Sequence, residues 1–207
     1  MKVQRFSSRD LASKAAASWL TCKIRHSLHA DETTGVIVSG GSTPKDCLEH
    51  LSKADLPWDR AMVSLTDERC VPVDDAASNE GMLREHFFVD RASAAAFQPV
   101  GDLQADSLSC ALVGMGEDGH FASIFPDNPD LESLLDPAAE PQTQQVETAG
   151  SEHKRMTLNL AWLLQSDHIL LLIFGNAKRE IVNNPGELPI AALLSQDQVP
   201  VAVYWAP

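Results

Sequence analysis

The sequence lacks the features that mark membrane, secreted and nucleic-acid-binding proteins. Only 16 residues are lysine or arginine against 29 that are aspartate or glutamate, a formal net charge of −13, which disfavours a surface for nucleic acid or anionic lipid. No apolar run approaches the roughly 20 residues of a membrane-spanning helix. The N-terminal stretch MKVQRFSSRD also lacks the apolar segment of a secretory signal. We therefore expect a cytoplasmic protein without nucleic-acid or membrane partners.

Paired cysteines and metal-binding motifs are missing as well. The four cysteines are far apart and form no CxxC pair, which is typical of thiols in a reducing compartment. The chain has no HExxH motif and no Cys/His cluster, so we predict no metal site. A Ser-His-Asp hydrolase is poorly supported because there is no G-x-S-x-G sequence.

Strand-like and helix-like segments alternate along a chain that has ample apolar residues for a core, with 44% hydrophobic residues. Apolar runs predict main strands at 35–41, 61–69, 108–116, 168–174 and 199–205, and short strands at 144–148 and 155–160. Helical spacing and capping residues predict helices at 8–27, 43–52, 78–88, 175–184 and 188–194, with residues 90–107 as a connection. We expect one α/β domain over residues 1–207, with a mostly parallel, Rossmann-like sheet and helices on both faces.

Parallel α/β sheets bind ligands at the carboxyl ends of their strands, so the loops after the strands are candidate sites. The first loop, SGGSTP, has Gly40 and Gly41, which let the backbone approach a ligand closely. Ser42 or Thr43 is predicted to be the N-cap of the following helix. Hydroxyls and free N–H groups at a helix start favour a phosphate or similar anion. An ordinary strand–helix turn uses the same residue types and remains the alternative.

The second loop, TDERCVP, places Asp67, Glu68 and Arg69 at a strand end. Arg69 can pair with one of the acids and still face an anionic substrate atom or a developing oxyanion. A solvated salt-bridge cluster is the alternative, and only the position of these residues at the expected cleft favours a site.

The third loop, GMGEDGH, has the G-x-G-x-x-G spacing of dinucleotide-binding loops. Glu117 and Asp118 disfavour a nucleotide because they would meet its pyrophosphate with negative charge, and Pro126 prevents the long helix that such a motif opens. The loop instead presents Asp118 and His120 after a central strand. Histidine is a common general base and an adjacent carboxylate can orient it, although a packed or surface histidine remains the alternative.

The fourth loop, GNAKRE, places Lys178 in the first turn of a helix, where the helix dipole does not favour a cation. A phosphate lying between the helix end and the lysine would explain this position, and an exposed lysine is the alternative. Arg155, in HKRMTL, is another candidate anion contact.

Taken together, these segments resemble the 6-phosphogluconolactonase family. SGGSTP, DERCVPVDDAASN, GMGEDGHFASIFP, RMTLN and GNAKRE occur in the order found in that family, and the resemblance spans roughly residues 8–205. Glucosamine-6-phosphate deaminases, which share the fold, usually show a D-E-Y-type loop and a G-x-G-x-x-G-H-I-A-F-N-type loop instead. Arg69, Glu117 and Ser123 place this chain on the lactonase side.

The resemblance implies a carboxylic ester hydrolase that opens 6-phospho-D-glucono-1,5-lactone to 6-phosphogluconate in the oxidative pentose phosphate pathway, without a metal or organic cofactor. By this resemblance His120 would activate water and Asp118 would orient or tune His120. Asp67 would face the sugar ring, and Arg69 would stabilise negative charge or grip the substrate. The 6-phosphate would be held by Gly40, Gly41, Ser42, Thr43, Lys178 and Arg155.

Two alternatives to the lactonase remain open. One is a deaminase or isomerase of amino-sugar phosphates with the same fold. The other is a non-catalytic regulator that binds a sugar phosphate, which the retained His120 and Asp118 disfavour. The partner expected in each case is a small molecule, and we expect a monomer.

Overall fold

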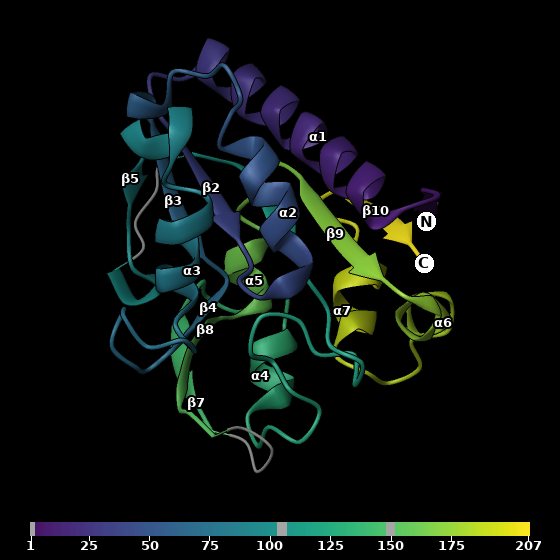
Figure 1. The fold of residues 1–207 in the computed structure, drawn as a ribbon. Helices are drawn as coiled ribbons and strands as arrows, with labels where there is room; N and C mark the ends of the chain where they lie inside the picture. Colours follow the sequence, from purple (N-terminus) through teal and green to yellow (C-terminus); the bar gives the residue numbers. More distant parts are fainter. Residues whose placement is uncertain (1–2, 103–106, 148–151) are drawn as a thin grey trace.

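The main sheet of the computed structural model has seven strands, and every neighbouring pair is parallel (Figure 1). The structure describes residues 3–102, 107–147 and 152–207. The prediction of a mostly parallel sheet flanked by helices is confirmed. In spatial order the strands are β1 (Val3–Arg5), β10 (Val201–Ala206), β9 (Ile169–Phe174), β6 (Leu108–Val113), β2 (Thr34–Val38), β3 (Ala61–Leu65) and β5 (Ala96–Phe97).

Helices connect these strands, and the longest lies along one face of the sheet. Helix α1 contacts β6, β9, β10 and the neighbouring α2 (Figure 1). Ser8 caps α1, because its Oγ accepts a hydrogen bond from the Leu11 N–H at 3.2 Å. The α-helices are α1 (Arg9–Ala30), α2 (Ser42–Leu51), α3 (Asn79–His86), α4 (Leu131–Leu135), α5 (Leu160–Leu163), α6 (Asn176–Asn183) and α7 (Ile190–Ser195).

The core is centred on strands β2, β6 and β9. All residues of β2 and β6, and all of β9 except Phe174, are buried. Strands that are covered on both faces have continuous apolar runs instead of alternating ones, which explains the sequences VIV, CALV and ILLLI. Burial of one such leucine or isoleucine stabilises the fold by about 1.5–3 kcal/mol.

One predicted strand is divided between two sheets. The segment 61–69 was expected to be continuous, but β3 ends at Leu65 and β4 (Asp67–Arg69) begins after Thr66. Thr66 makes the transition, since its N–H donates to Val38 O at 3.0 Å while its carbonyl accepts from the Leu158 N–H at 3.0 Å. Strand β4 then pairs antiparallel with β8 (Arg155–Leu158), which also pairs with β7 (Thr143–Val146).

Other boundaries differ where side chains give no clear pattern. The connection predicted over 90–107 contains the 3-10 helices Asp90–Ala94 and Val100–Asp102 and the two-residue strand β5, while residues 103–106 lie outside the described residues. The short strands predicted at 144–148 and 155–160 are present as β7 and β8, with Thr148 outside the described residues. Within the part of the chain that the structure describes, no helix has both the length and the apolar character needed to cross a membrane.

Candidate active site

The loops at the carboxyl ends of the central strands surround a cavity of about 210 Å³. Residues from all four predicted loops line it, although they are far apart in the sequence. Asp118 does not line the cavity but contacts His120, which does. The predicted site residues that line the cavity are Gly40, Gly41, Ser42, Thr43, Asp67, Arg69, His120, Arg155 and Lys178.

The SGGSTP loop opens the start of α2 toward the cavity. The predicted N-cap, Ser42 or Thr43, is wrong: Gly41 takes that position, with φ +95° and no side-chain hydrogen bond to the helix. A positive φ suits glycine, which has no Cβ to clash with the backbone. Gly40 has a second reason to be glycine, since a Cβ there would overlap the Asn79 amide. The N-cap residue therefore supplies no side-chain hydrogen bond to the first N–H groups of α2, which suits an anion.

His120 and Asp118 form a hydrogen-bonded pair. His120 Nδ1 lies 2.6 Å from Asp118 Oδ1, and the His120 backbone N–H donates to the same oxygen at 3.2 Å. A carboxylate at Nδ1 favours the tautomer with the proton on Nδ1, which leaves Nε2 with the lone pair that a general base needs. The His120 side chain is 26% exposed, so solvent can reach the ring.

The glycines of the GMGEDGH loop make room for this pair. A Cβ at Gly116 would lie 2.5 Å from Asp118 Oδ1 and closer still to the His120 imidazole. Gly119 has φ +77°, and a Cβ there would lie 2.7 Å from Leu188 Cβ. The Gly119 carbonyl also accepts a hydrogen bond from the Ile190 N–H at 3.0 Å. Close packing thus explains two of the three glycines of the G-x-G-x-x-G spacing, Gly116 against the histidine pair and Gly119 against Leu188.

Arg69 carries a positive charge that no described carboxylate neutralises directly. Its Nη1 donates to Ala77 O at 2.6 Å and to Asn79 Oδ1 at 2.9 Å, and its buried Nε has no partner among the described residues. Among the described contacts Arg69 pairs with neither Asp67 nor Glu68, so both the salt-bridge alternative and the expected pairing with one of the acids are wrong. Glu68 instead accepts backbone N–H groups at the start of α3, from Asn79 at 2.8 Å and Glu80 at 2.6 Å.

Arg155 adds a second guanidinium to the cavity. Its Nη1 lies 3.6 Å from Asp67 Oδ2, and its Cζ lies 5.4 Å from the centre of the Phe125 ring. Burial lowers the pKa of Arg155, and repulsion from Arg69 lowers it further. Arginine nevertheless stays protonated in proteins. Two mutually repelling cations at one cavity favour an anionic ligand, which would relieve the repulsion.

Lys178 lies half-buried in the first turn of α6. Helix α6 also begins at a glycine without a side-chain cap, Gly175, with φ +88°. Burial lowers the pKa of Lys178, while the negative charges of Glu117 and Asp118 act in the opposite direction. The alternative of a fully exposed lysine is wrong. Lys178 lines the same cavity as the start of α2, and both favour an anion.

Asn79 is a cavity residue that was not predicted as part of the site. Ser78 caps α3, its Oγ accepting from the Gly81 N–H at 3.0 Å. The buried Asn79 amide instead links two loops: Nδ2 donates to Asp67 O at 2.9 Å, and Oδ1 accepts from Arg69. Its position after a helix cap gave no indication of this role.

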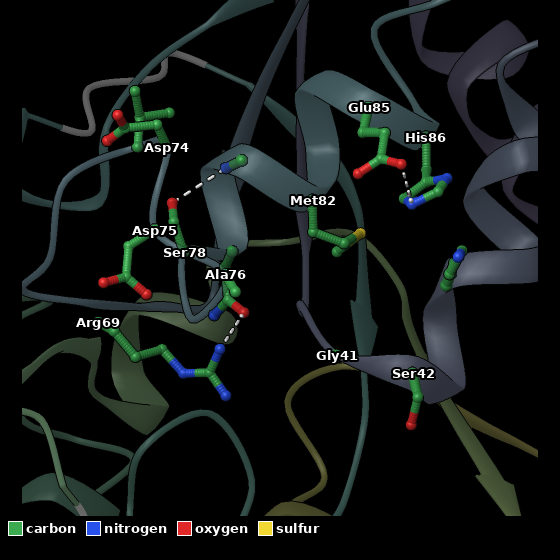
Figure 2. Close-up of a pocket in the computed structure, with 14 residues that line it drawn as sticks. Gly41, Ser42, Arg69, Asp74, Asp75, Ala76, Ser78, Met82, Glu85 and His86 are labelled. Carbon is green, nitrogen blue, oxygen red and sulfur yellow. Dashed lines mark hydrogen bonds and ion pairs between the residues drawn. The ribbon is translucent and has the colours of Figure 1, made fainter.

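A second cavity, of about 500 Å³, adjoins the first. The two share Gly41, Ser42, Arg69 and Asn79. Figure 2 shows Arg69 on one side of this cavity and the Glu85–His86 pair, at the end of α3, on the other. Arg69 therefore faces two adjoining spaces. No group of three or more potential metal ligands occurs within the described part of the chain.

Comparisons with known proteins show which family the chain belongs to. Residues 7–205 match the family described as glucosamine-6-phosphate isomerases/6-phosphogluconolactonase. The chain is 35% identical to a 6-phosphogluconolactonase of Caulobacter vibrioides, over 100% of this chain and 97% of the relative. It is 34% identical to that of Mesorhizobium japonicum, over 98% and 94%.

Solved structures show the same fold. The structure is similar to a crystal structure of a 6-phosphogluconolactonase from Shewanella baltica, with a TM-score of 0.89 and 28% identity over 99% of this chain and 97% of that one. A monomeric glucosamine-6-phosphate deaminase gives a TM-score of 0.72 at 18% identity, over 99% and 97%. At that identity the similarity shows a shared fold and nothing finer.

Proposed function

Because this chain belongs to the glucosamine-6-phosphate isomerase/6-phosphogluconolactonase family, we propose that it hydrolyses 6-phospho-D-glucono-1,5-lactone to 6-phosphogluconate in the oxidative pentose phosphate pathway. One observation carries the proposal: a single cavity brings His120, paired with Asp118, together with Arg69, Arg155 and Lys178. A lactone hydrolase needs a base for water, and a phosphorylated substrate needs cations. Relatives named 6-phosphogluconolactonase that match nearly the whole chain support the same activity.

The phosphate of the substrate binds at the helix starts. The N–H groups at the start of α2, after Gly41, and the ammonium of Lys178 surround one side of the cavity. Arg155 supplies a further charge. This combination suits a phosphate, because the side chains are positively charged and the N–H groups present the positive ends of their dipoles. Fixing the phosphate also fixes the distance of the lactone carbonyl from His120, which accelerates the reaction through positioning.

The hydrolysis itself uses His120 twice. Nε2 takes a proton from water while the water oxygen forms a bond to the lactone carbonyl carbon. The resulting imidazolium is stabilised by Asp118, and the negative charge on the carbonyl oxygen is stabilised by Arg69. The tetrahedral intermediate then collapses, the bond to the ring oxygen breaks, and that oxygen takes the proton from His120. The new carboxylic acid releases its proton to solvent.

The proposed enzyme is a cytoplasmic monomer, and residues 1–207 form one domain. It acts without a metal or organic cofactor. The hydrolysis is balanced with water and His120 alone, which supports the last point. The acidic composition and scattered cysteines support the compartment.

The test is to add purified protein to freshly generated 6-phosphogluconolactone and to follow ring opening against the spontaneous rate. We expect acceleration by the wild-type protein and by His29→Ala, a control at an exposed histidine in the last turn of α1. His120→Ala should lose most of the turnover. Wild-type protein without acceleration contradicts the proposal, and release of ammonia from glucosamine 6-phosphate would indicate a deaminase instead.

A further inference from the structure

Asp67 lies at the cavity with both carboxylate oxygens already bonded to protein groups. Oδ1 accepts a hydrogen bond from Thr66 Oγ1 at 2.8 Å, and Oδ2 accepts one from Ser123 Oγ at 2.6 Å. Arg155 Nη1 lies 3.6 Å from Oδ2. The Asp67 side chain is only 8% exposed. These contacts hold the buried carboxylate in one orientation at the edge of the cavity.

The hydrogen bonds around Asp67 have a definite direction. Ser39 Oγ accepts from the Gly114 N–H at 3.1 Å and lies 3.0 Å from Thr66 Oγ1. Because the Thr66 hydroxyl donates its proton to Asp67, Ser39 must donate to Thr66. The series therefore runs from Gly114 through Ser39 and Thr66 to the carboxylate. An ionised carboxylate only accepts, and it strengthens each donor that points to it.

These bonds join the segments that form the active site. Ser39 follows β2 and begins the SGGSTP loop, here called the phosphate loop, while Gly114 begins the loop that carries His120. Ser123 ends that same loop, and its N–H donates to Thr157 Oγ1 on β8 at 3.1 Å. One buried carboxylate thus holds both ends of the catalytic loop.

A second connection leads from Asp67 to the catalytic histidine through stacked side chains. Arg155 lies beside Asp67 and against the Phe125 ring. The Phe125 and His120 rings have centroids 4.3 Å apart. Displacement of Arg155 would therefore be felt at the imidazole as well as at the anion site. Ala122, between the histidine and Ser123, has φ +50°, a conformation that non-glycine residues keep only when neighbouring contacts hold it.

We propose that Asp67 and Ser123 are positioning residues: together they fix Arg155 and the two ends of the loop that carries His120, and Asp67 exchanges no proton with the substrate. This inference rests on the proposed lactonase function. It replaces the role expected for Asp67 from the family resemblance, in which the carboxylate faces the sugar ring.

The test uses Asp67→Asn, Ser123→Ala and the double variant. Ser109→Ala is the matched control, because Ser109 is also a buried serine whose Oγ donates a hydrogen bond, to Gly35 O at 3.1 Å, and it does not line the cavity. We expect kcat/KM to fall about 10-fold in Ser123→Ala and about 100-fold in Asp67→Asn, with the double variant close to Asp67→Asn because the two residues act as one unit. KM should rise in both, since Arg155 is displaced, and the pH dependence set by His120 should remain.

A second measurement needs no substrate. In the ligand-free protein, amide hydrogen exchange at Gly114 and Ser123 should be faster in both single variants and unchanged in Ser109→Ala. Unchanged exchange in both variants would overturn the inference whatever their activity. So would loss of kcat in Asp67→Asn combined with full activity in Ser123→Ala, because Asp67 would then act on the substrate directly. If the variants exchange faster than the wild-type protein, but the wild-type protein does not hydrolyse the lactone, the positioning role is supported and the proposed function is rejected.

Discussion

Gly116→Ala should separate turnover from binding more cleanly than a change to the histidine itself. The added Cβ would lie 2.5 Å from Asp118 Oδ1 and closer to the His120 ring, whereas ordinary contacts begin near 3.4 Å. The pair must therefore shift by about 1 Å, and a misplacement of that size costs roughly 100-fold in rate, or about 2.7 kcal/mol in the activation barrier. KM should stay within about twofold, because the side chain of residue 116 would point toward the histidine pair and not toward the phosphate loop.

The assay is steady-state lactone hydrolysis, with the thermal midpoint measured in parallel to show that the variant is folded. Gly101→Ala is the control, since a Cβ there has no neighbour within 4 Å among the described residues and the glycine does not have a positive φ. If Gly116→Ala keeps kcat within twofold of wild type, the histidine does not need the geometry seen here, and its assignment as the base loses its structural support.

Three further predictions concern the anion site, the histidine pair and the core. Burial lowers the pKa of Lys178 below the ordinary 10.5 of lysine, so affinity for 6-phosphogluconate should fall as the pH rises through that lowered pKa. In calorimetric titrations of Lys178→Arg the same decline should occur at higher pH. Lys178→Ala should mainly raise KM. Asp118→Asn should lower kcat about 10- to 100-fold with little change in KM, because an amide favours the wrong tautomer of His120. The loss is limited because solvent weakens the interaction between residue 118 and the imidazole. An unchanged kcat in stopped-flow assays would reject this pairing. Leu171→Ala, in the centre of β9 and fully buried, should lower the free energy of unfolding in urea by about 2–5 kcal/mol, against under about 0.5 kcal/mol for Leu11→Ala, which is 49% exposed.

Much of the site could be predicted because most candidates lie in loops that follow apolar strands. Parallel strands bring such positions to one edge, so Gly41, His120 and Lys178 could be expected together without knowledge of the strand order. The pairing of His120 with Asp118 was also predictable, since the two residues are close in sequence.

The contacts of Asp67 could not be predicted in this way. Its partners Ser123 and Arg155 come from remote segments, and nothing in a single sequence indicates which remote hydroxyl meets which carboxylate. The break at Thr66 was missed for the same reason: the residues on either side favour a strand equally, and only the remote partner β8 draws Asp67 away from the main sheet. Gly41 was missed as the N-cap because serine and threonine are the usual capping residues.

The order of strands also determines when activity can appear during folding. The central strand β6 pairs with β2 and β9, which place Gly35 beside Leu108 and Ala111 beside Ile169. Parallel pairing of such remote segments requires large loops to close first, so it is slow compared with helix formation. Gly41 and Arg69 lie in the first half of the chain, whereas His120 and Lys178 lie in the second. Neither half therefore contains a complete site. In a refolding experiment the recovery of enzymatic turnover should therefore lag behind the recovery of helical circular dichroism and coincide with the slowest phase.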